Sequence, residues 1–228
     1  MFFDRYDAGK QLAQKLISYK SSDTVVYALP RGGVLVGYEI AKSLKAPLDV
    51  VINRKIGHPL NKECAICAIT EEGEMVCDEL GLCGIDDDWI NIEATAQQKE
   101  ARRRRFVYKD NQPSISAEGK TAILVDDGIA TGLTMKAAIK TIEKQKPTKI
   151  IVAVPVAPHE VINKLNKIVD ETVVLLEEKS FQGAVGAYYR YFPEVFDKEV
   201  QVCLKKANKR KRKVSEKSYK FNPKVICT

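Results

Sequence analysis

The chain has 228 residues, of which 45% are hydrophobic and 29% are charged, and its formal net charge is +7. These values fit one globular domain with a sizeable core and exclude a membrane-spanning protein, because no apolar stretch approaches the length of a span. The first residues lack a basic segment followed by an apolar one, so we expect no signal peptide and a cytoplasmic protein.

The positive charge is concentrated at one end. Residues 205–228 carry ten Lys or Arg and one Glu, whereas the preceding 204 residues carry 27 basic and 29 acidic residues. A dense cationic run can bind RNA, DNA or an acidic surface through counterion release, but its composition favours a solvated, flexible terminus. The sequence therefore predicts a folded domain over 1–204 and a basic, flexible tail over 205–228.

Apolar periodicity predicts alternating helices and strands along the folded part. In chain order we expect a helix at 5–19, a strand at 25–29, a helix at 34–44, a strand at 48–53, a mixed segment to residue 77, a helix at 86–109, a strand at 122–125, a helix at 135–146, a strand at 150–154, a helix at 158–168 and a strand at 172–176. This alternation predicts an α/β fold, with an open, mostly parallel sheet flanked by helices.

The six cysteines raise the question of a metal site. Cys64 and Cys67 have zinc-ligand spacing, and Cys77 and Cys83 follow. Residues 64–78 alternate like a hairpin, however, which places Cys64 and Cys67 on opposite faces of a strand. We therefore expect ordinary reduced thiols, partly buried, and no zinc.

The loop after the strand at 122–125 carries the strongest functional signal. Two adjacent carboxylates, Asp126 and Asp127, end the strand, and a small, flexible turn leads into the next helix. Backbone N–H groups of the turn, with the hydroxyls of Thr131 and Thr134, would form a cup for a phosphate. The carboxylates suit vicinal hydroxyls or a hydrated Mg²⁺. Helix N-capping would explain one acid but not both, so the pattern predicts a site for a ribose 5-phosphate group.

A second loop, residues 28–33, also joins a strand to a helix and therefore lies at the same edge of the sheet. Gly32 and Gly33 let the backbone approach a ligand, and the fork of Arg31 matches phosphate oxygens. The alternative interpretation is a simple turn with an exposed arginine. The presence of the loop at 126–134 at the same sheet edge makes this interpretation less favoured.

The run Val125-Asp126-Asp127-Gly-Ile-Ala-Thr-Gly-Leu-Thr resembles the diphosphoribosyl-binding signature of type I phosphoribosyltransferases. Residues 2–200 as a whole are similar to a bacterial group in that family. The matching segments are 3–9, 28–34, 48–51, 54–57, 152–158 and 181–189. The resemblance implies the type I fold, with a small hood built from about 1–20 and 178–200 and a mobile flap at about 54–78.

The resemblance also implies a reaction: Mg²⁺-dependent transfer of 5-phosphoribosyl from phosphoribosyl diphosphate to a nitrogen acceptor, such as a nucleobase, with release of pyrophosphate. It further implies a homodimer. The catalytic residues would be Arg31, Lys55, Asp126 and Asp127, and the two acids would also hold the metal. The substrate-binding residues would be Pro30, Gly32, Gly33, Arg54, Gly128, Ile129, Ala130, Thr131, Gly132, Leu133 and Thr134.

The acceptor is not specified by these motifs. Enzymes acting on 6-oxopurines have an Asp immediately before the Thr-Gly pair, where this chain has Ala130, so hypoxanthine and guanine are not favoured. Phe181, Tyr188 and Tyr189 of the hood could stack on a base, although core positions are favoured for them.

Two further features have an unremarkable interpretation. His58 is expected to have no role, and the four arginines at 102–105 are expected to form a solvated helix end. A different functional class also stays open: a non-catalytic regulator that binds phosphoribosyl diphosphate and reaches nucleic acid through residues 205–228.

Overall fold

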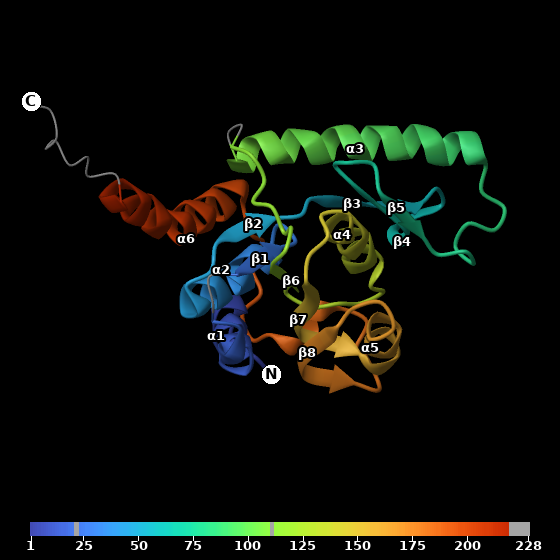
Figure 1. Ribbon diagram of the computed structural model, residues 1–228. Helices are drawn as coiled ribbons and strands as arrows, with labels where there is room; N and C mark the ends of the chain where they lie inside the picture. The colour runs from blue at the N-terminus through green and yellow to red at the C-terminus, as the bar shows by residue number, and fades with distance from the viewer. Residues whose placement is uncertain (21–22, 110–111, 219–228) are drawn as a thin grey trace, which may run out of the picture.

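The computed structural model describes residues 1–20, 23–109 and 112–218, and it shows a five-stranded sheet with helices on both faces (Figure 1). The strand order is β2-β1-β6-β7-β8, and every neighbouring pair is parallel. The strands are β1 (Thr24–Ala28), β2 (Leu48–Val50), β6 (Thr121–Val125), β7 (Lys149–Pro158) and β8 (Glu171–Glu178). The predicted open parallel sheet is confirmed.

Side chains of each strand alternate between two apolar layers. Val26 and Ala28 of β1 face one layer, whereas Val25 and Tyr27 face the other. The first layer is covered by α1 (Arg5–Lys15), α2 (Gly33–Leu44) and α6 (Asp197–Ser218), and the second by α4 (Leu133–Glu143) and α5 (His159–Leu165). Because both faces are covered, all five residues of β1 are buried, which explains why the strands appear as unbroken apolar runs.

The predicted mixed segment and the helix after it form a separate layer beside the main sheet. The strands β3 (Asn53–His58), β4 (Asn61–Thr70) and β5 (Met75–Cys77) make a three-stranded antiparallel sheet. The long helix α3 (Asp87–Lys109) runs across this small sheet (Figure 1) and packs Ala94 against Ile56 and Ile69.

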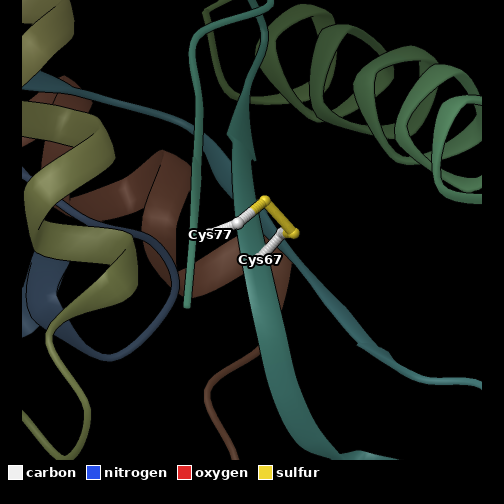
Figure 2. Close-up of a disulfide and its surroundings, with 2 residues drawn as sticks. All are labelled: Cys67 and Cys77. Carbon is white, nitrogen blue, oxygen red and sulfur yellow. A yellow bond between two sulfur atoms is a disulfide. The ribbon is translucent and has the colours of Figure 1, made fainter. Parts of the chain in front are cut away.

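The small sheet contains a disulfide that the sequence analysis did not predict. Cys67 of β4 lies directly opposite Cys77 of β5, and the two sulfurs are bonded (Figure 2). The expectation of reduced thiols is therefore wrong for this pair, because the spacing indicated a hairpin but not which residues would face each other. Cys64, Cys83 and Cys203 are free, and Cys227 lies outside the described residues.

Phe2 near one end of the chain and Asn208 in α6 both contact the main body. Phe2 pairs with Tyr189 in a short parallel bridge, which joins the two predicted halves of the hood. At the other end, α6 continues to Ser218, and the Asn208 side chain exchanges two hydrogen bonds with the backbone of Leu48. Helix α6 thus extends past the predicted domain boundary at residue 204, and residues 219–228 lie outside the described part. None of the described helices is long and apolar enough to span a membrane.

Candidate functional site

The strand order creates one point where neighbouring chain segments diverge. Ala28 at the end of β1 lies beside Val125 at the end of β6. The chain leaves β1 toward β2 on one side and leaves β6 toward β7 on the other. Ligands of open parallel sheets bind outside the carboxyl ends of strands at such a point. A cleft of about 660 Å³ opens there.

Most of the predicted site residues line this cleft. They are Pro30, Arg31, Gly32, Arg54, Lys55, Asp126, Asp127, Gly128, Ile129, Ala130, Thr131, Gly132 and Thr134. Two predicted residues do not. Gly33 is buried, with room for no Cβ because one would lie 2.8 Å from Asp126 Cα. Leu133, the first residue of α4, is 7% exposed and packs against Ala68 of the small sheet instead of lining the cleft.

The two carboxylates at the end of β6 are held in different ways. Asp126 Oδ1 accepts a hydrogen bond from the backbone N–H of Asp127 at 2.8 Å. Burial, and then the charge of Asp127, raise the pKa of Asp126 well above its usual range. Neither acid caps a helix, because α4 begins at Leu133 after Gly132, whose left-handed backbone (φ +80°) takes the N-cap position. The capping explanation for the acids is thereby excluded.

Arg5 is a cleft residue that the sequence analysis did not single out. Its Nε lies 2.7 Å from Asp127 Oδ2, its Nη1 donates to Pro193 O at 2.8 Å, and its guanidinium lies 3.6 Å above the centre of the Phe192 ring. Tyr189 adds a hydrogen bond from its hydroxyl to Asp127 O at 2.5 Å. The hood therefore fixes Asp127 through both its side chain and its backbone. The only signal in the sequence was the resemblance of residues 3–9, which gave Arg5 no role.

The loop after β1 touches the loop after β6. A Cβ on Gly32 would lie 1.9 Å from Asp127 Oδ2, so no larger residue fits without displacing that carboxylate. The Pro30–Arg31 peptide bond is cis. The Arg31 side chain is partly exposed and forms an ion pair with Glu194 of the hood at 2.6 Å.

The turn between Asp127 and α4 forms a cup of backbone donors. Ile129 N–H is occupied, because it donates to Val156 O at 2.9 Å. The N–H groups of Ala130, Thr131 and Gly132 have no acceptor among the described residues. The turn precedes the amino end of α4, where free N–H groups and the helix dipole favour an anion. The cup therefore suits a phosphate, bound by N–H groups other than that of Ile129.

The small sheet supplies the opposite wall of the cleft. Asn53 Nδ2 donates to Thr134 O at 2.5 Å and so anchors β3 to the start of α4. Arg54 Nε donates to Gln97 Oε1 of α3 at 2.9 Å, and the exposed Lys55 follows. Burial lowers the pKa of Arg54, and the charge of Arg104 lowers it further. His58 lies outside the cleft lining, where its Nδ1 accepts from Leu60 N–H in the turn after β3.

The aromatic residues of the hood divide between core and cleft. Tyr188 and Tyr189 are 4% and 6% exposed, and Phe181 stacks on Tyr188 with ring centres 5.3 Å apart. These three residues belong to the core, as the sequence analysis favoured. Phe192 and Val185 line the cleft instead. These two side chains give the hood side of the cleft an apolar surface.

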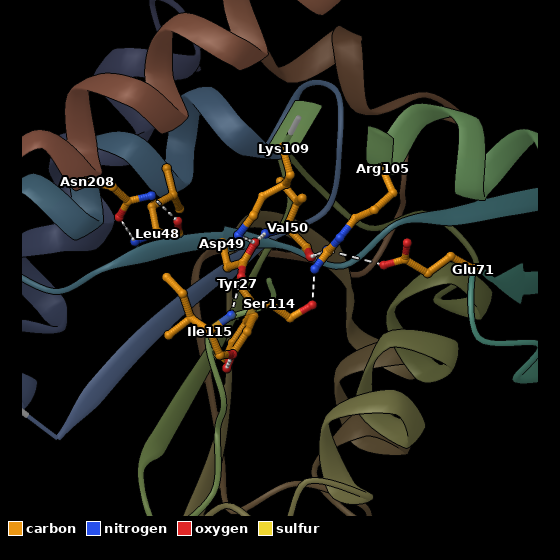
Figure 3. Close-up of polar contacts among 10 residues, drawn as sticks. All are labelled: Tyr27, Leu48, Asp49, Val50, Glu71, Arg105, Lys109, Ser114, Ile115 and Asn208. Carbon is orange, nitrogen blue, oxygen red and sulfur yellow. Dashed lines mark hydrogen bonds and ion pairs between the residues drawn. The ribbon is translucent and has the colours of Figure 1, made fainter. Parts of the chain in front are cut away.

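The arginines at 102–105 do not form a solvated helix end. Arg105 Nη1 donates to Val50 O at 3.0 Å and lies 3.2 Å from Glu71 Oε1, which ties α3 to β2 and to the β4–β5 turn (Figure 3). Lys109 pairs with the fully buried Asp49 at 2.7 Å in the same network. Arg104 lines the cleft. The prediction for this run is wrong, since only Arg102 and Arg103 are exposed.

The described residues contain no group of three or more His, Cys, Asp or Glu side chains that could hold a metal by themselves. Asp126 and Asp127 are the carboxylates at the cleft. Mg²⁺ commonly binds through one or two carboxylates, several waters and substrate phosphates. The donor set therefore fits a magnesium ion that arrives with a phosphorylated ligand, and it does not fit a zinc centre.

Comparison with known proteins identifies the family of the chain. Residues 3–192 match the family model described as phosphoribosyl transferase domain. Two proteins of Mycobacterium tuberculosis named as phosphoribosyl transferases, Rv0571c and MT0597, are 39% identical over 211 residues, which is 92% of this chain and 47% of theirs. The chain thus spans about half the length of these relatives. The crystal structure of TT1426 from Thermus thermophilus is 40% identical, with a TM-score of 0.74 over 90% of this chain and 98% of that one.

Proposed function

The chain belongs to the phosphoribosyl transferase family, and from this premise we propose that it transfers a 5-phosphoribosyl group from phosphoribosyl diphosphate to a nitrogen acceptor and releases pyrophosphate. One observation carries the proposal: the Gly32 loop and the Asp127 loop meet at a single cleft, where Gly32 leaves no room for a Cβ beside Asp127 Oδ2. A phosphate cup, two carboxylates and a cationic wall thus share one ligand site.

Each part of the donor has a matching group in this cleft. The free N–H groups of Ala130, Thr131 and Gly132, with the Thr131 and Thr134 hydroxyls, bind the 5′-phosphate. Asp126 and Asp127 hold the 2′ and 3′ hydroxyls of the ribose or the metal beside them. Arg31 and Lys55 bind the diphosphate, with Arg54 next to them on β3.

In the reaction, the bond from ribose C1 to the diphosphate oxygen breaks and a bond from C1 to the acceptor nitrogen forms. Positive charge develops on the ribose ring, and the two carboxylates stabilise it, while Arg31 and Lys55 stabilise the departing diphosphate. Mg²⁺ bound with the diphosphate would neutralise part of the leaving group's charge. The chain's own contribution is mainly positioning and electrostatic stabilisation.

The small sheet acts as the flap over this cleft in our proposal. It carries Arg54 and Lys55, and it is joined to α4 through Asn53. Closure of such a lid excludes water, which would otherwise hydrolyse the activated ribose.

The acceptor is a nucleobase or a related nitrogen compound. Ala130 stands where enzymes for 6-oxopurines have an Asp, so we do not expect hypoxanthine or guanine as acceptors. The acceptor would lie against Phe192 and Val185, which line the hood side of the cleft. We further propose a cytoplasmic homodimer, whose oligomeric state light scattering of the purified protein would test.

A second candidate is a regulator that binds the donor without turnover. It is favoured by α6, which carries the exposed Lys205 and Lys206 and is held to the main body by Asn208. This candidate predicts binding of phosphoribosyl diphosphate with no turnover of any acceptor, together with nucleic-acid retention that is lost on deletion of residues 205–228.

The test of the proposed function is pyrophosphate release from phosphoribosyl diphosphate and Mg²⁺ with a panel of nucleobases. We expect release that depends on one acceptor class and on the metal. Donor binding without release for any acceptor would favour the regulator, and absence of donor binding would contradict both candidates.

A further inference from the structure

The four consecutive arginines of α3 point in different directions because successive helix residues are rotated by about 100°. Arg102 and Arg105 lie on the side of the β4–β5 turn, where they contact Glu71. Arg103 is exposed and binds Glu100. Arg104 alone of the four lines the cleft.

Arg104 belongs to a polar stripe on α3 that faces the cleft wall. Residues 93, 97, 100 and 104 recur every three or four positions and so share one face of the helix. Gln97 Nε2 donates to Glu93 Oε1 at 2.7 Å, and Gln97 Oε1 accepts from Arg54 at 2.9 Å. Arg104 Nε donates to Glu100 Oε1 at 3.1 Å. The stripe thus holds two guanidinium groups, Arg54 and Arg104, at one wall.

The carboxylate beside Arg104 is shared with another cation. Arg103 donates to both oxygens of Glu100, at 2.6 and 2.9 Å. These hydrogen bonds, mainly those from Arg103, lower the pKa of Glu100 to about 2. One negative charge therefore serves two arginines, and Arg104 Nη1 and Nη2 have no acceptor in the described chain.

Positive charge exceeds negative charge on this side of the cleft, because Glu100 serves two arginines and Arg54 has no acid partner among the described residues. Arg54 binds only the neutral Gln97, and its terminal nitrogens also have no acceptor in the part of the chain that the structure describes. Arg31, Arg54 and Arg104 all line this cleft, so their like charges repel one another. Burial lowers the pKa of Arg54, and the charges of Arg104 and Arg31 lower it further. Side chains of Arg104 and Arg31 are 20% and 31% exposed, so water screens this repulsion only in part. A multiply charged anion would relieve it.

We propose that Arg104 binds the diphosphate of the sugar donor, together with Arg31 and Arg54, so that α3 forms part of the substrate site. The inference rests on the proposed function and extends it to a helix outside the two loops. Pyrophosphate fits the site because its several oxygens can pair with more than one guanidinium fork. Arg104 is thus a binding residue for the leaving group, and α3, the helix that packs on the flap, positions it.

The test compares binding of inorganic pyrophosphate and of ribose 5-phosphate by isothermal titration calorimetry, with Mg²⁺ present. Arg104→Gln should weaken pyrophosphate binding about tenfold, because hydrogen bonds to a charged partner are lost, and should leave ribose 5-phosphate binding unchanged. Arg104→Lys should give an intermediate loss, since it keeps the charge but not the fork. The matched control is Arg103→Gln, which removes the other partner of Glu100 and should change neither affinity.

Two results would overturn the inference. Pyrophosphate affinity of both Arg104 variants within twofold of the unmodified protein would show that Arg104 does not bind the diphosphate. Equal losses in Arg103→Gln and Arg104→Gln would show that the effect comes from Glu100 or the helix. The proposed function would survive either result if the unmodified protein still releases pyrophosphate with an acceptor. It fails together with the inference if the unmodified protein binds neither pyrophosphate nor the donor.

Discussion

The two walls of the cleft come from different kinds of chain segment. One wall consists of the loops after β1 and β6, in which ligand groups are close together in the sequence, such as Asp126 and Thr131. The other wall consists of β3 and α3, where Arg54 and Arg104 are 50 positions apart and are bound by Gln97 and Glu100 of α3, respectively. The first wall could therefore be identified from local spacing, whereas the second depends on how α3 packs across the small sheet.

The largest effect should follow from removing both acids of the first wall. Asp126→Asn with Asp127→Asn keeps the shape of the loop but removes the charges that face the ribose. We expect turnover to fall by at least about 10³-fold, as for the loss of a major electrostatic contribution. Pyrophosphate release by the folded double variant measures this, and turnover at the normal rate would rule out the assigned roles.

A smaller but still large loss of activity should follow when a side chain fills the space between the loops after β1 and β6. In Gly32→Ala the new Cβ would overlap Asp127 Oδ2 and lie 2.8 Å from Arg5 Nε. We expect a loss of about 1–3 kcal/mol in the free energy of unfolding from overpacking, and about 100-fold in kcat/KM from displacement of the carboxylate. Chemical denaturation and steady-state assays of pyrophosphate release measure the two losses.

Gly119→Ala is the control for the Gly32 variant. Its φ of +67° imposes backbone strain, but nothing lies within 4 Å of the new Cβ. It should lose stability without losing activity. If Gly32→Ala behaves in the same way, contact between the loops is not required for function.

Arg5 tests whether the hood holds the first wall in place. The side chains of Arg5 and Asp127 are only 8% and 16% exposed, so Arg5→Gln leaves a largely buried carboxylate without its partner. We expect a loss of about 3 kcal/mol in the free energy of unfolding, and a fall in kcat/KM of about tenfold, in chemical denaturation and steady-state assays. Arg190→Gln, an exposed arginine of the same segment as Tyr189, should change neither. Unchanged stability in Arg5→Gln would contradict the anchoring role.

Glu71, which pairs with Arg105 of α3, should make the stability of the protein modestly dependent on pH. Burial raises the pKa of Glu71 from 4.5 to about 6, so the folded protein binds more protons than the unfolded chain between these values. Stability contributed by this group is therefore highest below pH 4.5 and falls, by at most about 2 kcal/mol, as the pH rises to 6 and above.

Glu71→Gln should remove this part of the pH dependence. Thermal unfolding between pH 4.5 and 6.5 measures this pH dependence, with Glu79→Gln, an exposed acid that follows β5, as the control. An unchanged slope in Glu71→Gln, or an equal change in both variants, would contradict the assignment to Glu71.

The sequence predicted the main sheet well because its buried strands are continuous apolar runs and its loops carry local motifs. It also predicted most of the cleft lining, since Arg31 and Asp126 follow neighbouring parallel strands. Arg5 was missed because its partner Asp127 is 122 positions away. Arg104 was misassigned because the four arginines were treated as one group, whereas Arg103 and Arg105 make contacts different from those of Arg104. The Cys67–Cys77 bond was missed because it depends on a strand register that composition does not specify.

The central claim is that one cleft binds the whole sugar donor. A crystal structure of the protein with phosphoribosyl diphosphate and Mg²⁺ tests it most directly. We predict the 5′-phosphate against the N–H groups of Ala130 to Gly132, the ribose hydroxyls or the metal beside Asp126 and Asp127, and the diphosphate beside Arg31. A donor bound elsewhere, or a cleft that stays empty with the Arg31–Glu194 and Arg5–Asp127 ion pairs intact at saturating donor, would contradict it.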